Sequence, residues 1–206
     1  MKTGEAGARA GLSLWGKGPA MRFWASVAAI LLTAGAASAD DIAEKAAVCA
    51  ACHGETGIPI DKSIPVLWGQ NEGYIYIELR DMKKGVRKNE QMAPLVKEMS
   101  REDMLALAAY FAAKQWPNLQ QPRAKQEEQT HFESMATSAG CVGCHQAGYV
   151  GAGTQPRLAG QTQTYLEKTM LDFRTGARAN NSWMTDLLKT YSPADIAEMA
   201  RVLAGL

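Results

Sequence analysis

The stretch Cys49-Ala50-Ala51-Cys52-His53 recurs 92 positions later as Cys141-Val142-Gly143-Cys144-His145. Both stretches match C-x-x-C-H, the attachment sequence for haem c. Two thiols three positions apart on one helical turn can each add to a vinyl group of one porphyrin, and the adjacent histidine is then placed to bind the iron. A disulfide, a redox dithiol or half of a zinc site are the alternatives in an exported chain. Because the two copies use all four cysteines, we predict two covalently attached haem c groups.

The cysteine pattern lies within a longer internal repeat. Seven further residues recur 91 positions later, namely Pro65, Gly69, Gln70, Tyr74, Asp81, Gly85 and Arg87, which match Pro156, Gly160, Gln161, Tyr165, Asp172, Gly176 and Arg178. The offset returns to 92 at Met92 and Met184, so one residue is inserted before Met184. Such a repeat indicates a duplicated structural unit. We therefore predict two domains, 40–116 and 130–206, joined by a linker over 117–129 that is rich in Gln, Pro and charge.

Three helices are predicted in each copy from the spacing of apolar residues. The first begins near Ile42 and near His131 and carries the cysteines at its C-terminal end. The second spans 72–84 and 163–175 and is followed by a glycine, which suits a left-handed C-terminal cap. The third begins at Ser100 and at Ser192, each with an aspartate three residues later, which is typical of a helix N-terminus. No segment alternates as a strand does, so the predicted fold class is all-α.

The N-terminal residues 1–39 are predicted to be a secretory signal peptide. Arg22 precedes an apolar run from Phe23 to Leu32, and the small residues Ala37-Ser38-Ala39 suit a cleavage site. The apolar run is shorter than the roughly 20 residues of a membrane-spanning helix, so a retained anchor is the less favoured alternative. Met21 is an alternative start site, because the residues before it lack leader character. Export of this kind implies a periplasmic protein.

The charge of the remaining chain argues against a nucleic-acid partner. The full chain has 22 Lys and Arg against 21 Asp and Glu, and the first 39 residues hold four of the basic residues and one of the acidic ones. Residues 40–206 therefore hold 18 basic and 20 acidic side chains. Haem propionates would add negative charge, whereas nucleic-acid binding needs a basic face. We expect no nucleic acid and a neutral or basic protein partner.

A haem iron that carries electrons usually takes methionine as its sixth ligand, because a thioether raises the reduction potential. Met92 and Met184 each lie 39 residues beyond the motif histidine of their copy. The other methionines after the leader fall at helical positions and are predicted to be core residues, namely Met82, Met99, Met104, Met135, Met170 and Met199. We predict that His53 and Met92 bind one iron and that His145 and Met184 bind the other.

Residues around these ligands are predicted from the repeat as well. A metal-binding histidine commonly donates its second ring N–H to a carbonyl. Pro65 and Pro156 are the natural sources of that carbonyl, with a simple turn role as the alternative. Tyr74 and Tyr165 are candidates to donate to haem propionates, and packing alone is the alternative. The repeated arginines, Arg87 and Arg178, either neutralise propionates or, as is commoner for arginine, lie in solvent.

The repeated motifs resemble those of the cytochrome c4 family. The resemblance rests on Ile64-Pro65-Val66-Leu67-Trp68-Gly69-Gln70, Met92-Ala93-Pro94-Leu95-Val96, Pro156-Arg157-Leu158-Ala159-Gly160-Gln161 and Met184-Thr185-Asp186-Leu187. It covers nearly all of the mature chain. It implies two class I cytochrome c domains packed about a pseudo-twofold axis, each with several helices around one haem c. Gln146 departs from the family, which often has glycine after the haem histidine.

Three functions are compatible with these residues. The first is a carrier that moves single electrons between a respiratory donor and an acceptor such as a terminal oxidase. The second is a dihaem enzyme, such as a peroxidase or a thiosulfate dehydrogenase, which needs an open iron or an additional cysteine ligand. The chain has no fifth cysteine. The third is an electron-accepting haem subunit of a dehydrogenase complex. We predict a carrier rather than an enzyme, and the resemblance implies membrane-bound redox partners or peripheral membrane association.

Overall fold

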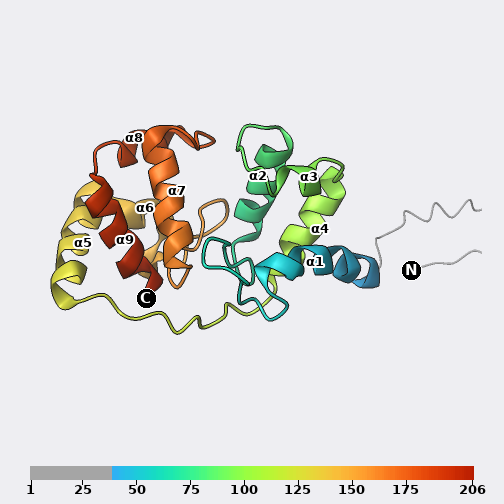
Figure 1. The fold of residues 1–206 in the computed structure, drawn as a ribbon, viewed down its shortest axis with the longest axis horizontal. Coiled ribbons are helices and arrows are strands. Elements are labelled where there is room, and N and C mark those ends of the chain that lie inside the picture. The colour runs from blue at the N-terminus through green and yellow to red at the C-terminus, as the bar shows by residue number, and fades with distance from the viewer. Residues whose placement is uncertain (1–38) are drawn as a thin grey trace, which may run out of the picture. The chain divides into compact units, whose positions relative to one another are not determined.

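The computed structural model describes residues 39–206, in which helices account for all regular structure (Figure 1). The predicted signal peptide, 1–39, lies outside the described residues apart from Ala39, where the first helix begins. The helices are α1 (Ala39–His53), α2 (Glu72–Lys83), α3 (Ala93–Val96), α4 (Arg101–Ala112), α5 (Gln126–Ala139), α6 (Cys141–His145), the 3-10 helix η1 (Ala147–Tyr149), α7 (Gln163–Thr175), α8 (Ser182–Leu188) and α9 (Pro193–Ala204). In residues 39–206 the β-type pairing is limited to one isolated bridge, between Ala152 and Gln155. The all-α prediction is confirmed.

The helices pack in two groups, each around its own apolar core. In the first half, α1 to α4 pack together around buried residues that include Val96, Leu107 and Phe111. In the second half, α5 to α9 pack around residues that include Ile196 and Phe173. Figure 1 shows the two groups as the blue-to-green and the yellow-to-red helices. None of the helices in the described part is both long and apolar enough to cross a bilayer.

The predicted helix ends agree with the structure where a capping residue defines them. The Ser100 hydroxyl accepts from the Asp103 backbone N–H at 2.9 Å, and the Asp103 carboxylate accepts from the Ser100 N–H in return. Ser192 and Asp195 repeat this pair at the start of α9. These caps satisfy backbone donors that the first helical turn leaves unpaired. Gly176 ends α7 with φ 79°, as a left-handed cap requires.

The predicted first helix of the second half is wrong in its extent. The structure begins α5 at Gln126, inside the segment predicted as linker, and ends it at Ala139. Gly140 then adopts φ 67°, a left-handed conformation that stops an α-helix. The second cysteine motif consequently occupies a separate one-turn helix, α6, whereas the first motif ends the continuous helix α1.

Gln146 occupies a backbone conformation that glycine adopts more easily. Its φ and ψ are 64° and 167°, and the corresponding residue of the first half, Gly54, has φ 94°. A side chain in this region of φ and ψ is disfavoured by about 1–3 kcal/mol. Glycine relieves this strain, but it also has more conformational entropy in the unfolded state, which offsets part of the gain. We therefore expect Gln146→Gly to raise the free energy of unfolding by about 1 kcal/mol. Denaturant unfolding measures the change.

Ala147→Gly is the matched control for this substitution, because Ala147 does not have a positive φ. The control gains glycine's unfolded-state entropy without relief of any strain, so it is expected to lower stability. Equal effects of the two substitutions would contradict the assignment of strain to Gln146.

Candidate haem sites

The first motif lies at the C-terminal end of α1, which brings its three residues to one end of a helix. Cys49 and Cys52 are three residues apart, so their side chains lie on neighbouring positions of one helix face. His53 is the last residue of α1, and 6 % of it is exposed. In the second half, Cys141, Cys144 and His145 lie together on α6. None of the four cysteines forms a disulfide in residues 39–206.

A prolyl carbonyl orients each motif histidine. Nδ1 of His53 lies 2.7 Å from the carbonyl oxygen of Pro65, and Nδ1 of His145 lies 3.1 Å from that of Pro156. A carbonyl only accepts, so Nδ1 carries the proton in both rings. Burial lowers the pKa of both histidines, which favours the neutral imidazole. Nε2 then keeps its lone pair, as an iron ligand must.

The two candidate methionine ligands share a local structure that sequence analysis missed. The Met92 backbone N–H donates to Oδ1 of Asn89 at 2.9 Å, and the Met184 N–H donates to Oδ1 of Asn181 at 3.2 Å. Both asparagines lie three residues before the methionine, and their offset of 92 was available in the sequence. Such Asx contacts stabilise a turn and fix its first residues. Ligation by Met92 and Met184 stays a prediction.

The remaining methionines lie in the two cores, as predicted. Four are at least nine-tenths buried and two are partly buried against the cores, namely Met82, Met104, Met170 and Met199, then Met99 and Met135. Leu67 and Trp68 pack against the first core and Leu158 packs against the second. Leu67, Trp68 and Leu158 belong to the loops that supply the prolyl carbonyls to the motif histidines. Their packing therefore holds these loops against the helices.

The last residue of the P-x-L-x-G-Q motif links the two halves. Gln70 pairs with both backbone polar groups of Arg157 in the second half. Gln161 pairs in the same way with the backbone of Val66 in the first half. Val66 and Arg157 are equivalent positions of the repeat, as are the two glutamines. Each half therefore makes the same contact with the other, as a pseudo-twofold relation requires.

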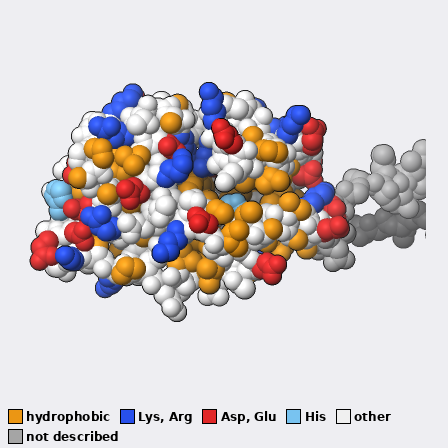
Figure 2. Space-filling model, in the orientation of Figure 1, with side chains coloured by type: hydrophobic (Ala, Val, Ile, Leu, Met, Phe, Trp, Pro, Cys, Tyr) orange, Lys and Arg blue, Asp and Glu red, His pale blue; other side chains and the backbone are white. Residues whose placement is uncertain are grey.

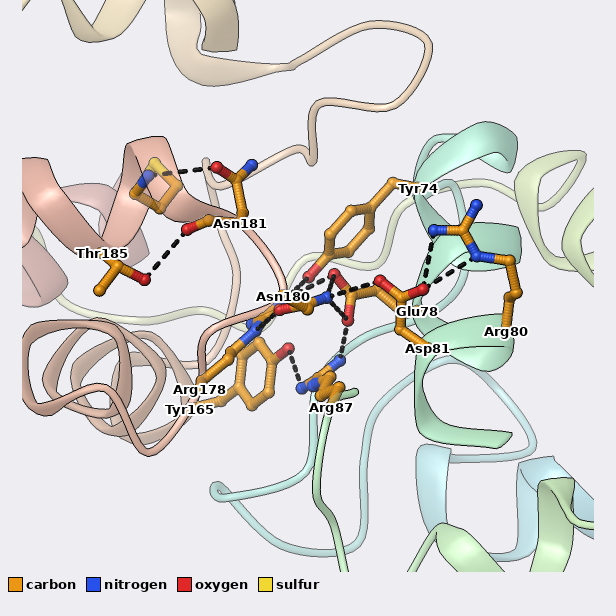
Figure 3. Close-up of polar contacts among 11 residues, drawn as sticks. Tyr74, Glu78, Arg80, Asp81, Arg87, Tyr165, Arg178, Asn180, Asn181 and Thr185 are labelled. Carbon is orange, nitrogen blue, oxygen red and sulfur yellow. Dashed lines mark hydrogen bonds and ion pairs between the residues drawn. The ribbon is translucent and has the colours of Figure 1, made fainter. Parts of the chain in front are cut away.

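A cluster of buried polar groups forms another contact between the halves (Figure 3). Tyr74 and Glu78 lie one turn apart on α2, and Tyr165 belongs to α7. Arg87 donates to the Tyr165 hydroxyl at 3.2 Å, and Arg178 donates to the Tyr74 hydroxyl at 3.3 Å. The reciprocal pattern again follows the repeat. We call these five residues, with Asn180, the interface cluster.

Glu78 is the acidic centre of the interface cluster and has no counterpart in the repeat. Its carboxylate accepts from Arg87 of its own half at 2.7 Å and from Arg178 of the other half at 2.5 Å. Asn180 also donates to this carboxylate. Residue 169, the equivalent position of the second copy, is a threonine, so the repeat gave no indication of Glu78. The interpretation of the two arginines as solvated surface residues is wrong, because the carboxylate draws both into the interface.

Tyr74 and Tyr165, the candidates to donate to haem propionates, have arginine partners in this structure. Both hydroxyls face the arginines of the opposite half. Burial opposes ionisation of Tyr165, but the charges of Arg87 and Arg178 outweigh it and lower the pKa of Tyr165 to about 8. Burial, together with the neighbouring Tyr165, raises the pKa of Tyr74. Two guanidinium groups against one carboxylate leave the interface cluster with positive charge, which suits an anionic group such as a propionate.

The residues at both motifs fit haem c. Each half offers two free thiols on one helical turn, beside a buried imidazole whose Nδ1–H is engaged by a carbonyl. This arrangement leaves Nε2 as the ligating atom and orients the ring from its far side. Two helical halves built around such motifs define a dihaem c-type cytochrome.

Comparisons with known proteins agree with this class. The model of the cytochrome c family matches residues 129–201. The chain is 34 % identical over 171 residues to cytochrome c4 of Pseudomonas aeruginosa, with 79 % of this chain and 85 % of that protein covered. It is 33 % identical to cytochrome c4 of Azotobacter vinelandii, with 79 % and 86 % covered. The chain therefore belongs to the cytochrome c4 family. As a member of this family it carries two covalently attached haem c groups and transfers electrons.

Solved structures support the same assignment. Reduced recombinant cytochrome c4 from Pseudomonas stutzeri superposes with a TM-score of 0.73 at 30 % identity, with 83 % of this chain and 100 % of that chain covered. Acidithiobacillus ferrooxidans cytochrome c4 gives a TM-score of 0.70 at 28 % identity, with 78 % and 99 % covered. Nearly the whole of each solved chain is thus matched by residues of this protein.

Proposed function

We propose that this protein is a periplasmic carrier that moves single electrons between redox proteins and transforms no substrate of its own. In this proposal His53 and Met92 bind one haem iron and His145 and Met184 bind the other. The observation that carries the proposal is the repeated contact between a buried motif histidine and a prolyl carbonyl, at 2.7 Å and 3.1 Å. An iron with both axial positions filled has no place for a substrate.

Each part of the site has a separate task in electron transfer. Bound haem supplies an iron that alternates between the ferrous and ferric states. Cys49 and Cys52, with Cys141 and Cys144, fix the position of the haem covalently. Pro65 and Pro156 hold the imidazole rings and raise their basicity. Burial of both histidines would limit the access of water to the bound iron on the histidine side.

The interface cluster supports a role of Tyr74 and Tyr165 near the haem propionates. Their hydroxyls lie among two buried arginines, where negative charge is favoured. We assign one haem to each of the predicted domains, 40–116 and 130–206, with 117–129 as the linker. Export by the predicted signal peptide would bring the chain to the compartment where covalent haem c attachment and redox partners are expected.

Contact with a redox partner is supported by apolar side chains near the first motif. Figure 2 shows apolar side chains gathered over α1 and the loop that follows it. Val48, Ile58 and Ile60 of this region are 60 %, 53 % and 70 % exposed. Exposed apolar groups beside a haem site suit transient contact with another protein. A membrane-bound donor or an oxidase is the partner class that we propose.

A second candidate function rests on other relatives. The chain is 30 % identical over 201 residues to the thiosulfate dehydrogenase electron acceptor of Stutzerimonas stutzeri strain A1501, with 88 % of this chain and 93 % of that protein covered. A tight association with a dehydrogenase would use the same haem chemistry. Co-purification from the periplasm distinguishes the two: a free carrier elutes alone, whereas a dedicated subunit elutes with its dehydrogenase.

Mass spectrometry of the native exported protein tests the proposed function. We expect the mass of the polypeptide from residue 40 plus two haem groups, and a redox titration that takes up two electrons per chain. Cys141→Ser combined with Cys144→Ser is the matched variant, in which one haem and one electron should be lost. A native mass without haem, or turnover of peroxide by the wild-type protein, would contradict the proposal.

A further inference from the structure

One peptide group in each half has polar partners on both sides. The peptide between Pro65 and Val66 accepts the His53 Nδ1–H on its carbonyl oxygen at 2.7 Å. Its N–H, that of Val66, donates to Oε1 of Gln161 at 2.8 Å. A single peptide therefore connects the motif histidine of the first half to a side chain of the second half.

The second half repeats this connection in the opposite direction. The peptide between Pro156 and Arg157 accepts the His145 Nδ1–H at 3.1 Å. Its N–H donates to Oε1 of Gln70, from the first half, at 2.7 Å. The arrangement thus occurs twice with exchanged roles, so it is a property of the repeated motif rather than of one local contact.

Additional hydrogen bonds fix both glutamine side chains in place. Only 3 % of Gln70 and 2 % of Gln161 is exposed. Nε2 of Gln161 donates to the carbonyl of Val66 at 3.1 Å, and Nε2 of Gln70 donates to that of Arg157 at 2.9 Å. Each Oε1 also accepts the backbone N–H of the next residue in its own chain segment, at 2.9 Å in both halves. The acceptor oxygen therefore has one fixed position against the peptide of the other half.

The backbone of the motif allows this close approach. Gly69 and Gly160, which precede the glutamines, have φ of 70° and 74°. A Cβ at Gly69 would lie 2.9 Å from the backbone nitrogen of Trp116, and a Cβ at Gly160 would lie 2.9 Å from the Trp116 indole nitrogen. Glycine is needed at both positions for conformation and for space.

Hydrogen bonds in a chain polarise one another. A peptide whose N–H is engaged has a more basic carbonyl oxygen, which strengthens the bond that this oxygen accepts. A stronger bond at Nδ1 makes an imidazole a more basic ligand. A more basic ligand stabilises ferric iron relative to ferrous iron and so lowers the reduction potential.

We propose that the glutamine of each half lowers the reduction potential of the haem in the opposite half. Gln161 acts on the first haem through the Pro65–Val66 peptide, and Gln70 acts on the second haem through the Pro156–Arg157 peptide. Both are positioning residues, because neither touches the iron or its ligand directly. The inference rests on the proposed ligation of the irons by His53 and His145.

The test is a crossed pair of substitutions in the intact dihaem protein. Gln161→Met and Gln70→Met keep a side chain of similar length and remove the amide. We expect Gln161→Met to raise the potential of the first haem and Gln70→Met to raise that of the second. Loss of one polarising bond should change the ratio of oxidised to reduced haem about threefold. At 59 mV per tenfold change, this corresponds to about 30 mV.

Two readouts assign each effect to one haem. Redox titration followed by NMR of the haem ring methyls separates the two potentials. NMR of the reduced protein follows the Nδ1–H protons of His53 and His145, and the proton of the opposite half should move upfield as its hydrogen bond weakens. Each variant is the control for the other, because the same chemical change is made at equivalent positions.

A third variant separates polarisation from general disturbance of the interface. Gln161→Glu keeps an oxygen acceptor for the Val66 N–H, so the first potential is expected to stay at or below the wild-type value. An upward shift of the first haem potential in Gln161→Glu would overturn the proposal. So would Met variants that shift the potential of the haem in their own half, or that shift neither potential. A wild-type protein without iron-bound histidine signals would instead refute the proposed ligation, so the two failures are distinguishable.

Discussion

Replacement of Glu78 by alanine is expected to lower the free energy of unfolding by ~3–5 kcal/mol. The Glu78 carboxylate accepts from Arg87 and Arg178, whose side chains are 12 % and 7 % exposed. Removal of the carboxylate leaves two guanidinium groups buried without their common anion. Both side chains have little contact with water, so most of the desolvation penalty remains. Chemical denaturation followed by circular dichroism measures the loss.

Glu44→Ala is the matched control for this prediction. Glu44 is exposed on α1, so its removal should change stability by no more than about 0.5 kcal/mol. Glu78→Gln adds a second test, because it keeps the shape and removes the charge. We expect most of the loss to persist in that variant. If Glu78→Ala lowered the free energy of unfolding by no more than about 1 kcal/mol, the two arginines would have other partners. That result would contradict the role of Glu78 as their main acceptor.

Substitution of Met184 by alanine is expected to remove one of the two methionine-to-iron signals. The weak long-wavelength absorption band of ferric haem bound by thioether sulfur should fall to half its intensity. The potential of one haem should drop by on the order of 0.1 V, because axial ligands set haem potentials over a wide range. The other haem should keep its potential. Visible spectroscopy and a redox titration of the exported protein provide the measurement.

Met199→Leu serves as the control for the ligand assignment. Met199 lies in the second core with 6 % exposed, and leucine conserves its volume approximately. This variant should keep both signals. Met92→Ala should remove the signal of the other haem. Loss of both signals from Met184→Ala, or of neither, is the result that would rule out its assignment.

The fold and the motif residues could be predicted because the repeat supplied two independent copies of each pattern. Cys49 and Cys141 or Ser100 and Ser192 recur in equivalent contexts, so each helix assignment was made twice. Where the copies differ, prediction failed. Gly140 stops α5 before the second motif, but Val48 occupies the equivalent position in the continuous helix α1. A single glycine near a helix end does not reveal whether it interrupts the helix.

The contacts between the halves could not be predicted from the sequence. Gln70 and Gln161 were visible as motif residues, yet their partners lie 87 and 95 residues away along the chain. Glu78 has no repeated counterpart, and the second copy has one inserted residue between Arg178 and Met184, in the segment that contains Asn180. Asn180 reaches Glu78 and Asp81 of the first half, so the asymmetry of the sequence becomes an asymmetry of the interface.

Gln70 and Gln161 recognise main-chain atoms, and this leaves the side chains of their partners free to diverge. Val66 is aliphatic and fully buried, whereas its equivalent, Arg157, lies 4.7 Å over the Trp116 ring near the segment that joins the halves. Both satisfy the same glutamine contact. After a gene duplication, selection can thus change what each copy presents at this position and still keep the pairing of the copies intact.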